Sequence, residues 1–305
     1  MAIVPTDVPM TAGLCARTMD ELTKEYPVLR RERLATTPFG RSMEALTVGS
    51  GDRRVLYCAA HHANEWITAT LLLKFAEDYA AAIHSGGEIA GSPARALSRQ
   101  ATIYMVPMVN PDGVDLVTGA LMPGQEQYEH ARSIAQNFPQ IPFPDGWKAD
   151  LGGVDLNLNY PAGWLMAREI KFRQGYTRPA PRDYVGRHPL SRGETQALYD
   201  LTRRVSPDLV IAFHTQGQVI YYQYGDIPVP GAEELAQKFA QLSGYAVEDT
   251  PYNSSFAGYK DWFIQEYRRP GFTIEAGLGT NPLPIDQFDR IYGENLPILV
   301  TAAQG

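Results

Sequence analysis

The sequence has little cysteine: its 305 residues contain two, Cys15 and Cys58. Two cysteines cannot build the disulfide framework of a small secreted scaffold. Cys58 lies inside an apolar run at positions 55–60, which predicts a buried core thiol, although one Cys15–Cys58 disulfide is also compatible with the sequence. The chain is therefore expected to be held together by its hydrophobic core.

Long hydrophobic runs and clusters of positive charge are also missing. No stretch reaches the ~20 apolar residues of a transmembrane helix, and residues 1–17 lack the basic and apolar segments of a secretory signal. Lys and Arg total 27 against 34 Asp and Glu, a net charge of −7. No basic run offers a surface for nucleic acid or an anionic membrane. We expect neither partner, and a cytoplasmic location by default, with cell-wall association left open.

Apolar runs bounded by turn residues alternate with helical patterns along the whole chain. Buried strands are predicted at residues 54–60, 102–109, 209–214 and 271–275, with an aromatic-rich strand at 218–224. Helices are predicted at residues 19–26, 65–83, 194–205, 232–243 and 285–301. This alternation predicts a single α/β domain with a central mixed, mainly parallel twisted sheet flanked by helices.

The domain is expected to cover residues 1–305, with residues 1–17 as an N-terminal extension, because no repeat or linker divides the sequence. Residues 113–150 are rich in Pro and Gly and show no period. We expect them to form an ordered surface loop, and loops of this length in a compact domain are usually functional.

Three of the six histidines lie where predicted strands end. His61 and His62 follow the first predicted strand, Glu65 comes three residues after His62, and His214 ends a later strand. Imidazole nitrogens and carboxylate oxygens are ordinary zinc ligands, and three protein ligands leave a fourth position for water. The pattern predicts one catalytic zinc ion held by His62, Glu65 and His214, with His61 as the alternative first ligand.

A carboxylate ends the last predicted buried strand. Glu275 follows the apolar segment 271–274, and a buried charge is costly unless it has a partner. At the carboxyl end of a strand it opens instead into the crevice where α/β sheets bind ligands. We predict that Glu275 is a general base; the alternative is a glutamate that only begins an exposed loop.

Six motifs occur in an order that resembles the carboxypeptidase A-like zinc peptidases. They are His-Ala-Asn-Glu-Trp-Ile (62–67), Asn-Pro-Asp-Gly (110–113), Gly-Val-Asp-Leu-Asn-Leu-Asn (153–159), Phe-His-Thr (213–215), Asp-Trp (261–262) and Phe-Thr-Ile-Glu (272–275). The match runs from about Leu22 to the C-terminus. The resemblance implies a zinc carboxypeptidase-like fold, with His62, Glu65 and His214 as zinc ligands and Glu275 as general base.

The resemblance implies further roles around the metal. Asn157 matches an asparagine that helps to hold the substrate's terminal carboxylate or backbone, and Asn159 of the same motif is also expected to bind substrate. Lys148 stands where the family has an arginine that supports the oxyanion. A catalytic tyrosine is expected shortly before the Asp-Trp motif. Tyr252, which we expect to bind substrate, and Tyr259 are both candidates.

Two departures from the carboxypeptidase pattern concern the substrate. Leu158 and Asn64 stand where carboxypeptidases have arginine, and leucine cannot form the bidentate fork that grips a C-terminal carboxylate. The same departures, with His-Thr-Gln-Gly (214–217) and Gly-Tyr-Lys-Asp-Trp-Phe-Ile (258–264), resemble the bacterial γ-D-glutamyl-L-diamino acid endopeptidases. These cut peptidoglycan stem peptides between D-Glu and the diamino acid. Some carry wall-binding LysM repeats, whereas this chain is expected to be a catalytic domain alone.

The resemblance thus implies zinc-dependent hydrolysis of a stem peptide or muropeptide, with Glu275 activating the water and Lys148 supporting the oxyanion. Arg178 and Arg182 are candidates for binding substrate carboxylates, or belong to a solvated loop. The alternatives are a metallocarboxypeptidase or amidohydrolase of other specificity, and a non-catalytic module that binds muropeptides. The presence of Glu275 argues against the module, because a binding protein needs no general base.

Overall fold

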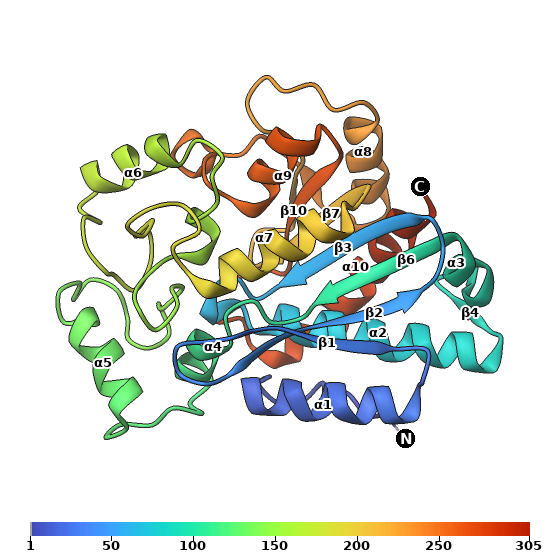
Figure 1. Cartoon of the computed structure of the whole chain (residues 1–305), viewed down its shortest axis with the longest axis horizontal. Helices are drawn as coiled ribbons and strands as arrows, with labels where there is room; N and C mark the ends of the chain where they lie inside the picture. Colours follow the sequence, from blue (N-terminus) through green and yellow to red (C-terminus); the bar gives the residue numbers. More distant parts are fainter. Residues whose placement is uncertain (1) are drawn as a thin grey trace.

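A computed structural model describes residues 2–305 and shows a mixed sheet with helices on both faces (Figure 1). In this part of the chain the sheet has eight strands in the order β1-β2-β6-β3-β7-β10-β8-β9. The strands are β1 (Arg30–Thr36), β2 (Ser42–Gly49), β3 (Arg53–Ala59), β6 (Ala101–Val106), β7 (Leu209–His214), β8 (Val219–Tyr221), β9 (Ala246–Val247) and β10 (Gly271–Glu275). A separate short hairpin pairs β4 (Glu88–Ile89) with β5 (Ser92–Pro93).

The helices connect these strands and cover the sheet. They are α1 (Ala12–Glu25), α2 (Ile67–Ser85), α3 (Ala94–Gln100), α4 (Pro111–Val117), α5 (Glu126–Ala135), α6 (Trp164–Arg173), α7 (Gly193–Val205), α8 (Ala232–Ser243), α9 (Tyr259–Tyr267) and α10 (Phe288–Gln304). Short 3-10 turns lie at η1 (Ala63–Glu65), η2 (Leu156–Leu158), η3 (Tyr252–Ser254) and η4 (Ile285–Gln287). Within residues 2–305 no helix is both long enough and apolar enough to cross a membrane.

The centre of the sheet is parallel. Strands β6, β3, β7 and β10 run in one direction, whereas the pairs β1–β2, β2–β6 and β10–β8 are antiparallel. The predicted α/β domain with a mixed, mainly parallel sheet is therefore confirmed. Because the carboxyl ends of the parallel strands lie at one edge, side chains that follow β3, β7 and β10 can meet there.

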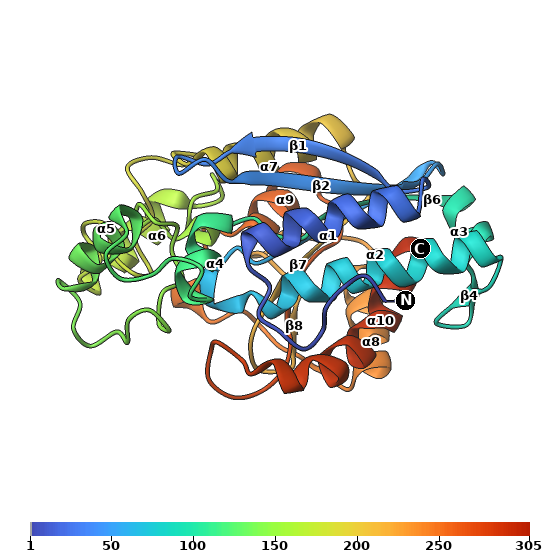
Figure 2. The same cartoon turned by 90° about the horizontal axis from the view of Figure 1, so that it is seen from below.

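Side chains of each central strand alternate between two core layers. On β3, Val55 and Tyr57 belong to the cluster that includes α1, α2, α8 and α10, whereas Leu56 and Cys58 pack with α7 and α9. Figure 2 shows α1, α2, α8 and α10 on one side of the sheet and α7 on the other. Burial on both faces explains the continuous apolar runs of these strands. Cys15 and Cys58 are both buried and are not joined by a disulfide.

The structure corrects the prediction that residues 113–150 form a loop, because most of α4 and all of α5 lie within them. Helix α4 begins at Pro111, which follows the cap residue Asn110, and a proline in the first turn costs no hydrogen bond. Figure 1 shows α4, α5 and α6 grouped beside the end of the sheet at which β3 and β6 finish. These segments border the candidate site.

Candidate metal centre

The ends of three neighbouring strands bring the predicted site together. β7 and β10 are parallel partners, and their register places His214 beside Glu275. On the other side of β7, β3 ends at Ala59. The next residue, Ala60, has φ of 49°, a left-handed conformation that turns the chain sharply toward His62 and η1.

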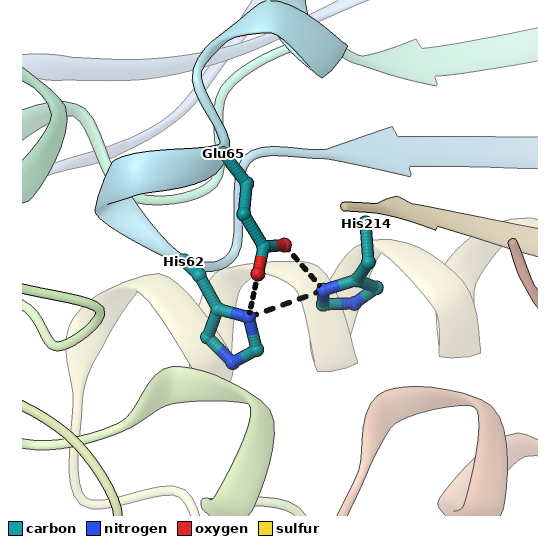
Figure 3. A group of neighbouring side chains, drawn as sticks. All are labelled: His62, Glu65 and His214. Carbon is teal, nitrogen blue, oxygen red and sulfur yellow. Dashed lines mark hydrogen bonds and ion pairs between the residues drawn. The ribbon is translucent and has the colours of Figure 1, made fainter. Parts of the chain in front are cut away.

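The carboxylate of Glu65 lies between two imidazole rings, as Figure 3 shows. Glu65 Oε1 is 2.8 Å from His62 Nδ1, and Glu65 Oε2 is 2.8 Å from His214 Nδ1. The two Nδ1 atoms are 3.2 Å apart, and one ligand atom from each residue falls within 4.8 Å of the others. Two ring nitrogens and a carboxylate that converge in this way offer their lone pairs to one cation.

The residues behind the cluster also fit a metal. His62 Nε2 is 3.2 Å from Asp155 Oδ1, so the ring can donate its Nε2–H to that carboxylate and keep an unprotonated Nδ1 facing Glu65. A carboxylate behind a ligating histidine is the usual device that fixes the ring and its tautomer. Asp155 is held in turn, because its Oδ2 accepts a hydrogen bond of 3.1 Å from the N–H of Asp183.

Glu65 is ionised in this setting. Burial alone would raise the pKa of Glu65, but the neighbouring charges of His62, Lys148 and His214 hold that pKa well below its usual range. Lys148 Nζ donates to Glu65 Oε1 over 3.0 Å. Once a metal ion displaces the protons from the two ring nitrogens, the cluster would offer one anionic and two neutral donors, the ligand set of an open catalytic zinc site.

Glu275 lies next to these donors and faces a cleft. Burial raises the pKa of Glu275 above its ordinary value and the charge of Glu65 adds to this, while His214, Lys148 and His62 act in the opposite direction. A carboxyl group with a raised pKa takes up a proton and returns it more readily near neutral pH. Its position and its environment suit a general base.

Lys148 is fixed beside the cluster by a buried backbone network. The N–H of Ala63 donates to Lys148 O over 3.0 Å, and Asn110 Nδ2 donates to Ala149 O over 2.9 Å. Gly113 packs so tightly here that a β-carbon would lie 2.6 Å from Ala149 O. This close approach explains the glycine of the Asn-Pro-Asp-Gly motif, which supports the segment that carries Lys148.

The structure separates the residues that the sequence left as alternatives. His61 is fully buried, with Nε2 at 3.1 Å from Tyr160 Oη, and does not belong to the metal-binding group. Tyr259 is also fully buried, and its hydroxyl is 2.8 Å from Thr202 Oγ1. Tyr252 is 64% exposed, and the structure does not bring it to the cleft, although its neighbour Pro251 lines it.

The two asparagines of the Asn-Leu-Asn motif have different positions. Asn157 lines the cleft, with its Nδ2 3.4 Å from His214 Nε2 and its Oδ1 accepting the N–H of Tyr259 over 3.1 Å. The structure does not bring Asn159 to the cleft. Asn159 is fully buried, and its amide joins the backbone of Val185 to the hydroxyl of Thr195.

Two hollows meet at Glu275. The first, here called the inner cavity, has a volume of about 230 Å³ and is lined in part by His62, Asn157 and Leu158. The second, called the outer groove, has about 800 Å³ and includes Asn64 and Asn281. The residues that line both hollows are Lys148, Arg182, Tyr221 and Glu275. The cleft therefore continues on both sides of Glu275.

The two candidate arginines also differ in whether they reach the cleft. Arg182 lines both hollows, and its Nε donates to Asp183 Oδ2 over 2.9 Å. Arg178 instead lies over the ring of Phe138, with 6.0 Å between its guanidinium carbon and the ring centre.

Sequence reasoning assigned no role to Asp155, although it lies in the Gly-Val-Asp motif, two residues before Asn157. The carboxylate in that motif was the feature of the sequence that could have identified Asp155 as a partner of the metal site.

An open group of two histidines and a glutamate beside a strand-end carboxylate, at the crevice of an α/β sheet, defines a zinc hydrolase site. A family model described as zinc carboxypeptidase matches residues 15–297. The chain belongs to this family and is a zinc metallopeptidase.

Particular relatives agree with this assignment. The chain is 42% identical over 280 residues to γ-D-glutamyl-L-diamino acid endopeptidase 1 of Lysinibacillus sphaericus, an alignment that covers 92% of this chain and 68% of the relative. Among solved structures, thrombin activatable fibrinolysis inhibitor aligns with a TM-score of 0.74 and 16% identity, over 100% of this chain and 76% of that one. Murein-tripeptide amidase MpaA of Escherichia coli O157 aligns with a TM-score of 0.55 and 20% identity, over 88% and 91%. Both structural likenesses show the fold.

Proposed function

We propose that this protein hydrolyses the bond between γ-D-Glu and the L-diamino acid of peptidoglycan stem peptides. The observation that carries the proposal is the cleft that passes Glu275 and continues on both sides of it. An enzyme that cuts within a peptide needs room for residues on either side of the scissile bond. The relative that is 42% identical bears the name of this activity, which supports the same assignment.

The charges of the inner cavity argue against ordinary C-terminal trimming. Each of its basic side chains is paired with an acid, at 3.0 Å for Lys148–Glu65, 2.6 Å for Lys171–Asp183, 2.9 Å for Arg182–Asp183 and 2.6 Å for Lys260–Asp261. Leu158 is 8% exposed and presents an apolar surface in the same wall. A free C-terminal carboxylate would thus meet only cations whose charge is already matched by an acid, which makes the loss of its water costly.

The two hollows then receive the two halves of the substrate. We place the leaving diamino acid in the inner cavity, beside Asn157 and Leu158, and the γ-D-Glu half in the outer groove, beside Asn64 and Asn281. The scissile carbonyl lies between them, next to Glu275 and Lys148, which line both hollows.

His62, Glu65 and His214 would hold the zinc ion, which supplies Lewis-acid activation of water and of the carbonyl when bound. Glu275 takes a proton from the attacking water and passes it to the leaving amine. Lys148 places a cation where negative charge develops on the carbonyl oxygen. Asp155 orients His62 through its Nε2–H and takes no part in proton transfer to substrate.

The test compares two substrates for the zinc-loaded protein. One is the stem peptide L-Ala-γ-D-Glu-diaminopimelyl-D-Ala, and the other is a hippuryl-type carboxypeptidase substrate. We expect cleavage only between γ-D-Glu and diaminopimelate, identified by product masses, and a kcat/KM at least ~100-fold higher than for the hippuryl substrate, the discrimination that unpaired buried polar groups can provide. Comparable efficiency would support a carboxypeptidase instead, and binding without cleavage of either would support a non-catalytic muropeptide module.

A further inference from the structure

Residues 181–184 hold Asp155, the carboxylate behind His62, at two points. The N–H of Asp183 donates to Asp155 Oδ2 over 3.1 Å, and the N–H of Asp155 donates to Tyr184 O over 2.8 Å. These bonds fix both the carboxylate and the backbone of the same residue. The other carboxylate oxygen, Oδ1, is then directed toward His62 Nε2, from which it is 3.2 Å away.

This arrangement depends on an unusual backbone conformation at Asp183. In an extended chain, the N–H of one residue and the C=O of the next point to opposite sides. At Asp183 φ is 67°, in the left-handed region, and the turn there directs its N–H and the C=O of Tyr184 to the same residue, Asp155. A residue with a β-carbon adopts this conformation at a cost and keeps it only where its surroundings hold it.

The side chain of Asp183 is held by two cations. Its Oδ1 pairs with Lys171 Nζ at 2.6 Å, and its Oδ2 accepts a hydrogen bond of 2.9 Å from Arg182 Nε. Lys171 projects from α6 and is only 6% exposed. A buried ion pair of this kind adds little net stability compared with apolar packing. What it provides here is a fixed position for Asp183.

The beginning of the segment is fastened without the Asp183 side chain. Pro181 O accepts the N–H of Lys148 over 2.8 Å and the N–H of Ala149 over 2.9 Å. Gly153 packs against the same stretch so closely that a β-carbon there would lie 2.9 Å from the nitrogen of Ala180. A substitution at Asp183 should therefore change how Asp155 is held without unfolding the segment.

We propose that Lys171 and Asp183 are positioning residues of the metal centre. Their ion pair holds Asp183 in its left-handed conformation, the N–H of Asp183 fixes Asp155, and Asp155 orients His62 toward the metal. Both residues also line the inner cavity, so a direct contact with substrate is the alternative role. The two roles differ in what they affect: positioning acts on zinc binding through Asp155, whereas a substrate contact acts on KM alone.

The first measurement is the zinc affinity of Asp183→Ala, determined by competition with a chelator. Alanine removes both ion pairs and tolerates a positive φ less well than aspartate. We therefore expect zinc to bind about 10-fold more weakly, the lower end of the range for groups behind a metal ligand. Asp183→Asn keeps a hydrogen-bond acceptor and tolerates this φ, so it should restore most of the affinity. An unchanged zinc affinity of Asp183→Ala, with a raised KM, would overturn the proposal in favour of a substrate contact.

Lys171→Met should weaken zinc binding in the same way as Asp183→Ala, because it leaves the carboxylate without its buried partner. Arg173→Met is the matched control: Arg173 lies on the same helix and pairs with Glu169, but both are exposed. This control should leave the zinc affinity unchanged. An equal loss of affinity in the control and in Lys171→Met would mean that the ion pair has no specific effect on the metal centre.

A double-mutant cycle tests whether the effect passes through Asp155. In protein that already carries Asp155→Asn, Asp183→Ala should cause little further loss of zinc affinity, since the group through which it acts has been removed. Equal losses in the two backgrounds would show that Asp183 does not act through Asp155 and would overturn the proposal. The cycle does not need Lys171→Met, so it decides the matter even if that variant fails to fold.

Cobalt(II) in place of zinc gives a readout that a general loss of stability does not move. A smaller folded fraction lowers the amount of bound cobalt, whereas a reoriented His62 changes the position of its visible absorption bands. We expect these bands to shift in Asp183→Ala and Lys171→Met and to stay in place in Arg173→Met. A lower melting temperature with unchanged bands and unchanged zinc affinity would indicate a purely structural ion pair and overturn the proposal.

Discussion

Glu194 is a buried carboxylate outside the cleft whose ionisation opposes folding. It lies in the first turn of α7 and is 1% exposed, and neither of its oxygens has a hydrogen-bond partner among residues 2–305. Burial raises the pKa of Glu194 from 4.5 to about 7, with a further contribution from the nearby charge of Asp150, while Arg192 acts in the opposite direction. Replacing it with glutamine keeps the shape and removes the charge.

The size of the expected stability change follows from the linkage between protonation of Glu194 and folding. Between pH 4.5 and about 7 the folded protein holds the Glu194 proton more tightly than the unfolded chain does, so stability falls as the pH rises through this range. Above pH 7 the penalty is complete. A pKa difference of about 2.5 corresponds to about 3 kcal/mol. Glu194→Gln should therefore raise the free energy of unfolding by about 3 kcal/mol at pH 8 and change it little at pH 4.5.

The assay is urea denaturation of the zinc-loaded wild-type and variant proteins at both pH values. Glu233→Gln is the matched control, because Glu233 occupies the same position in the first turn of α8 but is exposed. That control should lose at most ~1 kcal/mol, the helix-dipole contribution of a carboxylate there. Equal stability of wild type and Glu194→Gln at pH 8, or a gain that does not depend on pH, would refute the reasoning.

Two further outcomes concern the metal centre. Asp155→Asn removes the acceptor behind His62 and should weaken zinc binding by about 10- to 100-fold in a chelator competition. His62→Ala should abolish stoichiometric zinc binding. Unchanged zinc affinity in both variants would mean that the ion is bound elsewhere. Glu275→Gln should keep its zinc but lose roughly 10²- to 10⁴-fold in kcat on the stem peptide, and near wild-type turnover would show that another group activates the water.

The sequence was sufficient to predict the central strands and their consequence for the site. The strands that end at Ala59, His214 and Glu275 are buried on both faces, so each appears in the sequence as a continuous apolar run that can be recognised. Because parallel neighbours end at one edge, strand-end residues far apart in the chain become adjacent. The convergence of His62, Glu65 and His214 on one point follows from that rule.

The outer strands were not predicted, for a physical reason. β1 has the sequence Arg-Arg-Glu-Arg-Leu-Ala-Thr and is half-buried or exposed along its length, so no apolar period marks it. Its charges are satisfied across the sheet edge, for example by Glu44, which pairs with Arg31. Edge strands with charged side chains are protected from pairing with other chains, and the same feature hides them from pattern analysis.

Residue roles that depend on side-chain direction could not be predicted either. Asn157 and Asn159 are two positions apart in one motif, yet the first faces the cleft and the second is enclosed by the loops at Val185 and Ser191. Asn157 lies inside the η2 turn and Asn159 directly follows it, and sequence spacing does not describe the side-chain directions in such a turn. Tyr252 and Tyr259 were likewise separated only by the burial of Tyr259.

Strand β10 links the position of Glu275 to the packing of the hydrophobic core. Its odd positions, Thr273 and Glu275, face the inner cavity, whereas Phe272 and Ile274 belong to the hydrophobic core. A shift of the strand by a single residue would exchange these two sets, turning Glu275 into the core and the core side chains into the cavity. The apolar residues that fix the register of β10 therefore also fix the position of Glu275 beside His214. Core packing on one face of β10 thus positions a cleft carboxylate on the other face.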